Sequence, residues 1–225
     1  VRAVLTARSV LVTGASGALG QVVAETARLQ GALVSALDLH ECAGHEDIRK
    51  FSVDLTDAPA TMECIRQIGD IDVVFNIAGG FAMGPAVHKT TAEQWDHMFR
   101  MNVSTMRNTV SAVVPKMVAR GHGSIVNVGA MSAREGQANM GAYCVAKSTV
   151  MRLTESLSKE LRQQGINVNA VLPSIIDTPA NRADMPDADF SNWVRPQDLA
   201  NVICFLGSEA ARAVHGALLP VQALA

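Results

Sequence analysis

The stretch Val10-Leu-Val-Thr13-Gly14-Ala-Ser16-Gly17-Ala18-Leu19-Gly20 decides the fold of this 225-residue chain. A short apolar, β-branched run is followed directly by a glycine-rich turn, and residues 19–30 then repeat apolar side chains at helical spacing. Glycines allow the tight turn and let the backbone approach a pyrophosphate group without a Cβ in the way. A strand, a glycine turn and a helix N-terminus together predict a phosphate-binding site, whereas the same glycines alone often form a plain turn.

The next apolar run, residues 32–37, ends in Asp38, eighteen residues after Gly20. A carboxylate at this point can accept hydrogen bonds from both hydroxyls of an adenosine ribose, and it repels a 2′-phosphate. The glycine turn and the residues directly after Asp38 contain no lysine or arginine. The pattern favours NAD over NADP as cofactor, with a plain polar strand end as the alternative.

Apolar runs and helical patterns alternate along the chain. Helical periodicity is seen at residues 58–68, 91–117, 142–164 and 196–206, and Pro115 is expected to stop or kink the second of these helices. Strands are expected at residues 10–13, 32–37, 50–53, 73–76, 124–128 and 167–172. Unbroken apolar strands that alternate with helices indicate a parallel sheet covered on both faces. The sequence therefore predicts an α/β fold, a single Rossmann-type doubly wound parallel sheet, with one domain over residues 1–225.

Composition narrows the class of protein. The chain is 48% hydrophobic and 18% charged with a formal net charge of -2, which is typical of a globular protein. It has no basic run for nucleic acid, no apolar run near the roughly 18 residues of a membrane span, and no signal-peptide pattern. Four scattered cysteines without a C-x-x-C motif or a His/Cys cluster argue against a metal site and favour reduced thiols in the cytoplasm.

Tyr143 and Lys147 carry the clearest chemistry. They lie four residues apart on the expected helix 142–164, so their side chains project from the same face. A nearby cation favours phenolate and lowers a phenol pKa that is otherwise about 10, which makes a tyrosine usable as an acid or base. Tyr143 is also the only tyrosine in the chain. Taken alone, the pair is more typical of an amphipathic surface helix, because a helix with one tyrosine often has a lysine four residues later.

Further motifs favour a catalytic role for Tyr143 and Lys147 over a surface pair. Thr13-Gly14-x-x-x-Ala18-x-Gly20, Asn76-x-Ala78-Gly79, Asn102, Tyr143-x-x-x-Lys147 and Pro173-x-x-x-x-Thr178 follow one another in this order. With them the chain resembles the short-chain dehydrogenase/reductase family essentially from end to end, and residues 216–221 resemble the family's final strand. The helices 105–117 and 142–164 resemble those through which family members form dimers and tetramers, so we expect a homo-oligomer.

The resemblance implies a role for each matching residue. Tyr143 would donate or accept the proton, Lys147 would hold the nicotinamide ribose and lower the tyrosine pKa, and Asn102 would position a water that links Lys147 to solvent. Cofactor contacts are implied for Gly14, Ser16, Gly17, Ala18, Leu19, Gly20, Asp38, Asp54, Leu55, Asn76, Ala78, Gly79, Lys147, Pro173 and Thr178. The family's usual glycine after that proline is Ser174 here.

A larger departure lies thirteen residues before Tyr143. The family usually has a serine there that hydrogen-bonds the substrate carbonyl, and this chain has Ala130. Ser132 is a candidate replacement, although residues i and i+2 of a strand lie about 7 Å apart. Loss of one positioned donor typically costs about 10²–10³ in rate, so an ordinary ketone reductase should suffer.

The dihydropteridine reductase branch of the family manages without this serine. Residues 78–82, in which Phe81 follows a glycine pair, and residues 177–193 resemble that branch, whereas Asn102 looks more like the broad family. Residues 174–195 are expected to form a substrate-covering loop. Phe190 and Trp193 are candidates for stacking on a flat heterocycle, or else they anchor the loop to the core.

Three functions follow from these residues. The first is an NAD(H)-dependent reductase of a small conjugated acceptor, with a quinonoid dihydropterin as the sharpest candidate. The second is an alcohol dehydrogenase or a ketone or 3-oxoacyl reductase, in which Ser132 or a water takes the missing role. The third, from another class, is a dinucleotide-binding protein without catalysis, which Ala130 favours and the joint presence of Tyr143, Lys147 and Asn102 opposes.

Overall fold

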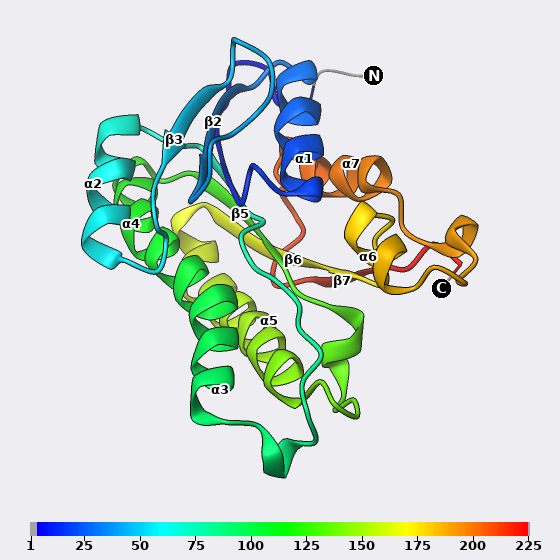
Figure 1. The fold of residues 1–225 in the computed structure, drawn as a ribbon. Helices are drawn as coiled ribbons and strands as arrows, with labels where there is room; N and C mark the ends of the chain where they lie inside the picture. Colours follow the sequence, from blue (N-terminus) through cyan, green and yellow to red (C-terminus); the bar gives the residue numbers. More distant parts are fainter. Residues whose placement is uncertain (1–3, 225) are drawn as a thin grey trace.

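The computed structural model of the protein describes residues 4–224 (Figure 1). Within these residues, seven strands form one fully parallel sheet in the order β3-β2-β1-β4-β5-β6-β7. The predicted doubly wound α/β fold is confirmed. The strands are β1 Ser9–Thr13, β2 Leu33–Asp38, β3 Arg49–Ser52, β4 Val73–Asn76, β5 Gly123–Val128, β6 Ile166–Pro173 and β7 Leu218–Val221.

Helices cover both faces of this sheet, as Figure 1 shows. One face carries α1 and α7, and the other carries α2, α4 and α5; the short α6 lies beside α7, and α3 packs against α5. The helices are α1 Ala18–Leu29, α2 Ala58–Ile68, α3 Ala92–Phe99, α4 Thr105–Arg120, α5 Gly141–Leu161, α6 Pro179–Asp184 and α7 Pro196–Leu206.

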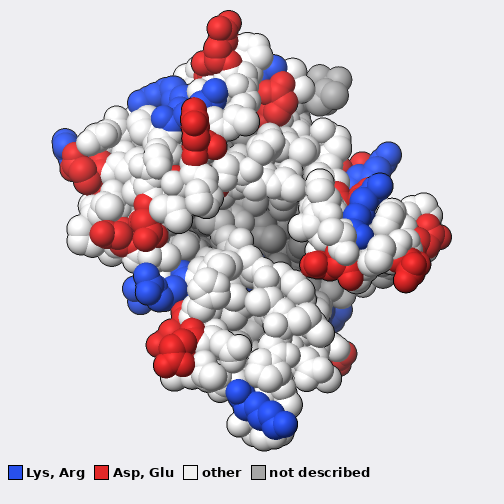
Figure 2. Space-filling view, in the orientation of Figure 1, with Lys and Arg blue, Asp and Glu red and all other residues white. Residues whose placement is uncertain are grey.

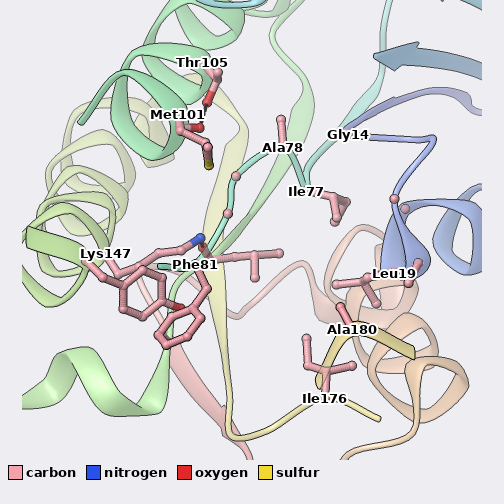
Figure 3. Close-up of a pocket in the computed structure, with 18 of the residues that line it drawn as sticks. Gly14, Leu19, Ile77, Ala78, Phe81, Met101, Thr105, Lys147, Ile176 and Ala180 are labelled. Atoms are coloured by element: carbon pink, nitrogen blue, oxygen red, sulfur yellow. Dashed lines mark hydrogen bonds between the residues drawn. The ribbon is translucent and has the colours of Figure 1, made fainter. Parts of the chain in front are cut away.

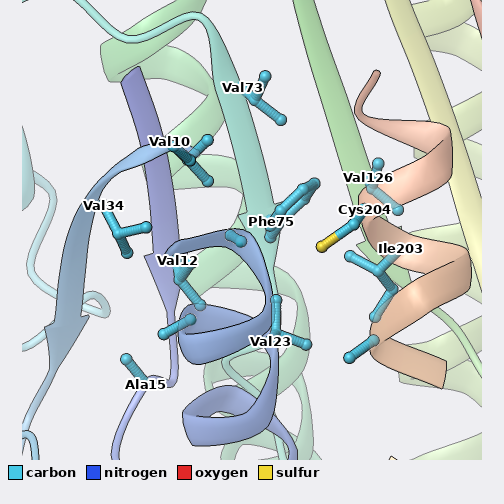
Figure 4. Packing of buried hydrophobic residues seen from close by; sticks show 14 of the residues in the cluster. Val10, Val12, Ala15, Val23, Val34, Val73, Phe75, Val126, Ile203 and Cys204 are labelled. Carbon is cyan, nitrogen blue, oxygen red and sulfur yellow. The ribbon is translucent and has the colours of Figure 1, made fainter. Parts of the chain in front are cut away.

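Alternate residues of the central strands fill two separate cores. Val10, Val12 and Phe75 point toward Val23 of α1 and Ile203 of α7, as Figure 4 shows, and all five are fully buried. The residues between them on the strands face the helices of the other layer. Both faces are therefore apolar, which explains why the strands read as unbroken runs of apolar residues.

The expected helix 91–117 differs from the structure. It is divided into α3, a π-helical turn at Arg100–Ser104, and α4. Pro115 lies inside α4 and does not end it; the helix runs to Arg120 and stops at Gly121, whose φ of 72° is left-handed. The predicted stop at Pro115 is wrong, because the packing of α4 against the sheet and α2 outweighs one missing backbone donor.

None of the helices between residues 4 and 224 has the length and hydropathy needed to cross a bilayer. In the same part of the chain, no group of three or more His, Cys, Asp or Glu side chains is placed to hold a metal ion.

Candidate active site

A cavity of about 1350 Å³ opens at the carboxyl ends of the strands. Its walls come from the turn after β1, the ends of β2 and β3, the segment after β4, one face of α3, the start of α5 and the segment after β6. Figure 2 shows the hollow in the middle of one face of the molecule, with mostly uncharged surface below it. This is the crevice beside the switch between β1 and β4 where open parallel sheets bind their ligands.

The glycine turn forms one wall and leaves no room for side chains. Gly14 has a φ of +66°, and a Cβ on it would lie 2.7 Å from the backbone of Ala78. A Cβ on Gly20 would overlap the carbonyl oxygen of Gly14. The Thr13 hydroxyl oxygen accepts hydrogen bonds from the N–H groups of Ile77 and Ala78, each at 3.2 Å. The turn is thus held against the exit of β4 and presents bare backbone to the cavity, which fits a dinucleotide pyrophosphate.

Asp38 faces the same cavity with both carboxylate oxygens engaged. Oδ2 accepts from the backbone N–H of Ser16 at 3.0 Å, and Oδ1 accepts from that of His40 at 3.1 Å. These bonds fix the carboxylate at the edge of the glycine turn. A fixed anion at this point suits ribose hydroxyls and opposes a phosphate.

The exit of β3 forms the next wall, where Asp54, Leu55 and Thr56 all line the cavity. Hydrogen bonds from Thr56 hold the pKa of the Asp54 carboxyl below its ordinary value, with a smaller contribution from the Arg100 cation. Arg100 Nη2 donates to the Thr56 hydroxyl oxygen at 3.3 Å. Arg100 was missed by sequence reasoning, because only the fold brings it to a residue 44 positions earlier in the chain.

Tyr143 and Lys147 lie together on the cavity side of α5. Lys147 is only 6% exposed, and its ammonium donates to the carbonyl oxygen of Val128 at 2.9 Å. Phe81 stands edge-on to the Tyr143 ring, with centroids 5.0 Å apart. Figure 3 shows Lys147 and Phe81 on one side of the pocket, with Leu19, Ile176 and Ala180 on the other.

The protonation of this pair differs from the prediction. Burial raises the pKa of Tyr143 to about 12 and lowers the pKa of Lys147 to about 8. The expectation that Lys147 lowers the tyrosine pKa is therefore not met in this site. The reason is that both groups lose hydration, while the lysine donates its hydrogen bond to Val128 instead of the phenol.

Asn102 lies behind the cavity wall, and its side chain hydrogen-bonds the backbone of two neighbouring segments. Its amide nitrogen donates to the carbonyl oxygens of Gly80 and Met98, at 3.0 and 3.1 Å, and its oxygen accepts from the Gly80 N–H at 3.1 Å. A Cβ on Gly79 would lie 2.6 Å from that oxygen and 3.2 Å from the Lys147 nitrogen. Asn102 therefore holds the backbone that borders Lys147, and its role in positioning a water stays a prediction.

Asn76 does not reach the cavity, unlike the other predicted cofactor residues. It is 4% exposed and donates to the Asn127 side chain at 2.8 Å, which in turn donates to the Thr154 hydroxyl at 2.9 Å. Asn76 thus joins β4 to β5 and α5 beneath the site. The remaining fourteen predicted cofactor residues all line the cavity.

Strand β5 ends at Val128, Ala130 follows with extended backbone, and Ser132 lies in a 3₁₀ turn at Met131–Arg134. The two residues therefore do not share a strand, so the spacing of about 7 Å between residues i and i+2 of a strand does not apply to them. Ala130 is 4% exposed and belongs to an apolar cluster against which Tyr143 packs. Both Ala130 and Ser132 line the cavity, so the wall beside Tyr143 has a methyl group where the family usually has a hydroxyl, and Ser132 adds a hydroxyl nearby.

Phe190 and Trp193 do not line the cavity. The predicted stacking on a flat substrate is therefore wrong, and the alternative holds, in which the two rings anchor the loop. Trp193 is 5% exposed, its ring lies 4.8 Å from that of Phe190, and the Arg182 guanidinium lies 4.6 Å over the Phe190 ring. The Trp193 ring is buried and the Phe190 ring is half-buried, and the adjacent Val194 forms a parallel bridge with Ile176 that joins this end of the loop to the segment after β6. From residues 174–195, the side chains of Ile176, Ala180, Asn181 and Met185 reach the cavity instead.

Comparison with known proteins agrees with this geometry. Residues 8–189 match the family model described as short chain dehydrogenase. The chain belongs to the short-chain dehydrogenase family. The family is one of oxidoreductases that use NAD(P), and in this chain the glycine turn, Asp38, Tyr143 and Lys147 all line one cavity.

Relatives of this short-chain dehydrogenase span different substrates. It is 31% identical over 201 residues to a sorbitol dehydrogenase of Cereibacter sphaeroides, covering 84% of this chain and 77% of the relative. It is 32% identical over 242 residues to a 2-(R)-hydroxypropyl-CoM dehydrogenase of Xanthobacter autotrophicus, covering 94% and 96%.

Solved structures show the same fold. A carveol dehydrogenase from Mycobacterium avium in complex with NAD superposes with a TM-score of 0.86 at 27% identity, covering 98% of each chain. A putative NAD(P)-dependent gluconate 5-dehydrogenase from Beutenbergia cavernae with bound NADP gives a TM-score of 0.89 at 25% identity, covering 99% and 98%. The short-chain dehydrogenase thus resembles proteins that hold either cofactor.

Proposed function

We propose that this short-chain dehydrogenase is an NADH-preferring reductase of a small, uncharged, conjugated acceptor, with a quinonoid dihydropterin as the sharpest candidate. The observation that carries the proposal is Ala130, whose buried methyl group lies in the cavity wall beside Tyr143. A ketone reductase gains about 10²–10³ in rate from a hydroxyl donor at such a point. An electron-poor conjugated ring depends less on that donor.

The chain's own residues supply the proton. A bound dinucleotide carries the hydride to or from the substrate. Tyr143 keeps its proton throughout the physiological range, because burial raises its pKa to about 12, so its hydroxyl is ready to donate to the reduced substrate. The buried Lys147 ammonium lies one helical turn away on the same side of α5, where it would hold the nicotinamide ribose. Asn102 keeps the Gly79–Gly80 backbone beside that ammonium.

The charge of the cavity supports an uncharged substrate. Among the described residues that line it, the lysine and arginine side chains are those of Lys147 and Arg100. Lys147 is buried beside Tyr143, and Arg100 is hydrogen-bonded to Thr56 at the β3 exit. Neither is placed to hold a carboxylate or phosphate of a substrate. Near Tyr143 the lining includes the apolar side chains of Phe81, Ala130 and Met131, and the covering loop adds Ile176 and Met185 elsewhere in the same cavity.

The preference for NADH rests on Asp38. Its carboxylate is fixed by two backbone N–H groups at the place where a 2′-phosphate would have to bind. The similarity to a carveol dehydrogenase in complex with NAD supports this choice, and the similarity to a protein with bound NADP opposes it.

A second candidate is an alcohol dehydrogenase or a ketone or 3-oxoacyl reductase. Ser132 favours it, because this residue lines the cavity close to Ala130. The 28% identity to the 3-oxoacyl-[acyl-carrier-protein] reductase of Escherichia coli, over 233 residues, points the same way. A non-catalytic dinucleotide-binding protein is the third candidate, and the buried Tyr143–Lys147 pair opposes it, since burying a lysine has no use in simple binding.

A homodimer or homotetramer in the cytoplasm is part of the same proposal. The exposed valines Val118 of α4 and Val145 of α5, 36% and 45% exposed, lie on the two helices expected to form the subunit interface. Burial of such side chains between subunits is favourable.

The test is NADH oxidation, followed by absorbance, with quinonoid dihydropterin, then a panel of ketones and 3-oxoacyl thioesters. Fast reduction of the pterin with feeble ketone reduction is the expected result, and good ketone reduction instead would favour the second candidate.

Tyr143→Phe should lower kcat by about 10²–10⁴ and spare NADH binding. Persistent turnover in this variant would refute the proton relay, and tight NADH binding without turnover on any acceptor would favour the binding protein.

A further inference from the structure

Arg100 brings a cation to the end of the cavity formed by the exits of β2 and β3. The residue is exposed, lines the cavity, and donates from Nη2 to the Thr56 hydroxyl oxygen at 3.3 Å. Asp54 and Leu55, which the resemblance to the family implies lie beside the adenine, directly precede Thr56 in the same wall. Arg100 has no part in the proton relay, so its place in the cavity needs a separate explanation.

The fold fixes this position from two sides. Arg100 opens the π-helical turn Arg100–Ser104 at the end of the face of α3 that borders the cavity. In the first turn of the following helix α4, the buried Asn108 amide donates to the carbonyl oxygens of Leu55 and Thr56, at 2.9 and 3.3 Å. Asn108 therefore ties α4 to the exit of β3, and the Arg100 guanidinium is held near Thr56 by the backbone as well as by its own hydrogen bond.

Besides the polar side chains of Asp38 and His40, this end of the cavity contains apolar side chains. Val53 and Leu55 are buried, with 9% and 5% exposed, and Leu39 lines the cavity with 58% of its surface open. An adenine ring is flat and uncharged, and it needs apolar contact on its faces. A guanidinium is planar and stacks on aromatic faces better than an ammonium does.

We propose that Arg100 is an adenine-binding residue whose guanidinium packs against the ring of the bound dinucleotide, with the Thr56 hydroxyl setting its orientation. The neighbouring Asp54 carboxylate and the Thr56 hydroxyl partly satisfy its charge and donors, so it favours the neutral ring over a 2′-phosphate. The contribution of Arg100 should therefore be the same for NADH and NADPH. This inference requires only dinucleotide binding and is independent of the acceptor proposed above.

The experiment is a set of binding measurements on Arg100→Met, which keeps the length of the side chain and removes the guanidinium. The probes are NADH, NADPH, ADP-ribose and reduced nicotinamide mononucleotide, titrated by calorimetry against the full chain. Affinity for NADH, NADPH and ADP-ribose should fall by about 3- to 30-fold, and affinity for the mononucleotide, which lacks adenine, should change by less than about 2-fold.

Two further variants separate this role from a structural one. Thr56→Val should weaken ADP-ribose binding when it is introduced into the native protein. When it is introduced into Arg100→Met it should have almost no added effect, because both changes remove the same guanidinium oriented by the Thr56 hydroxyl. Arg212→Met, at an exposed arginine outside the cavity, should bind all four probes normally. Unchanged ADP-ribose affinity in a folded Arg100→Met would overturn the proposal. A loss of affinity for NADPH alone would also overturn it, as would a loss of affinity for the mononucleotide as large as the loss for ADP-ribose.

Discussion

Ala130 decides the substrate class at the scale of a single residue. Ala130→Ser places a hydroxyl in the cavity wall beside Tyr143, where a ketone oxygen would accept its hydrogen bond. We expect kcat/KM for ketones to rise by about 10- to 100-fold, while reduction of a conjugated acceptor changes by less than about 3-fold. Steady-state rates on both kinds of acceptor measure the effect.

Ala133→Ser is the matched control for this change. Ala133 is equally buried, at 4%, in the same cluster, but it does not line the cavity. Its hydroxyl should cost stability without changing the ratio of the two activities. Equal ketone rates in Ala130→Ser and the unmodified protein would show that another group, with Ser132 the nearest candidate, already supplies the donor.

Asp38 makes the second prediction at this scale. Replacing the carboxylate by an amide in Asp38→Asn removes the negative charge that opposes a 2′-phosphate, and it keeps a side chain of the same size beside Ser16. In the native protein, the dissociation constant for NADPH should exceed that for NADH by more than about 10-fold. In Asp38→Asn this ratio should be about 10-fold smaller, which is equivalent to about 1.4 kcal/mol. Direct titration of both cofactors measures it, and a native protein that binds NADPH more tightly contradicts the assignment.

At the scale of elements, the strand–glycine turn–helix unit was predictable because its physics is local. The β-branched run, the glycines and the amphipathic helix follow one another within residues 10–30, and the structure confirms β1 and α1 there. No local pattern in the sequence marks the π-helical turn, and the side-chain hydrogen bonds of Asn102 within it reach Gly80, which is 22 residues away. The same limit applies to Phe190 and Trp193, whose aromatic character is equally compatible with an anchor and a substrate wall.

The glycine turn gives a prediction about this element. In Gly20→Ala the new methyl group overlaps the carbonyl oxygen of Gly14, so the turn or α1 must move. We expect a loss of unfolding free energy of about 3 kcal/mol or more, measured by urea denaturation without cofactor. Gly17→Ala is the control within the same turn, because its methyl group would meet the nearest atom only at 3.4 Å. A similar loss in both variants would mean that backbone entropy, and not the overlap, explains the glycines.

At the scale of the whole molecule, the cavity collects segments that the sequence separates widely. Tyr143 and Lys147 come from one helix and were found through their spacing. Arg100, Ile176 and Met185 reach the site through the packing of α3 and of the covering loop, so no local pattern marks them. The sheet itself was predictable, since its alternating pattern extends over the entire chain.

The burial of Lys147 makes the stability of the whole molecule depend on pH. Burial lowers its pKa in the folded protein to about 8, below the ordinary 10.5 of the unfolded chain. Between these two values the unfolded chain holds a proton that the folded protein has lost, so the free energy of unfolding rises with pH. The rise from pH 7 to pH 9.5 amounts to about 2 kcal/mol, because one pKa unit corresponds to about 1.4 kcal/mol. Tyr143 lowers the free energy of unfolding with rising pH only above about pH 10, where the unfolded chain loses the phenol proton that the folded protein keeps.

Urea denaturation of the cofactor-free protein and of Lys147→Met at both pH values measures this contribution. Lys147→Met removes the buried ammonium, so it should be more stable than the native protein at pH 7, and this advantage should shrink by about 2 kcal/mol at pH 9.5. Lys159→Met, at an exposed lysine of the same helix, should follow the native protein at both pH values. Parallel behaviour of Lys147→Met and the native protein would mean that Lys147 titrates alike in the folded and unfolded states. Its ammonium would then keep its charge well above pH 8 in the folded protein.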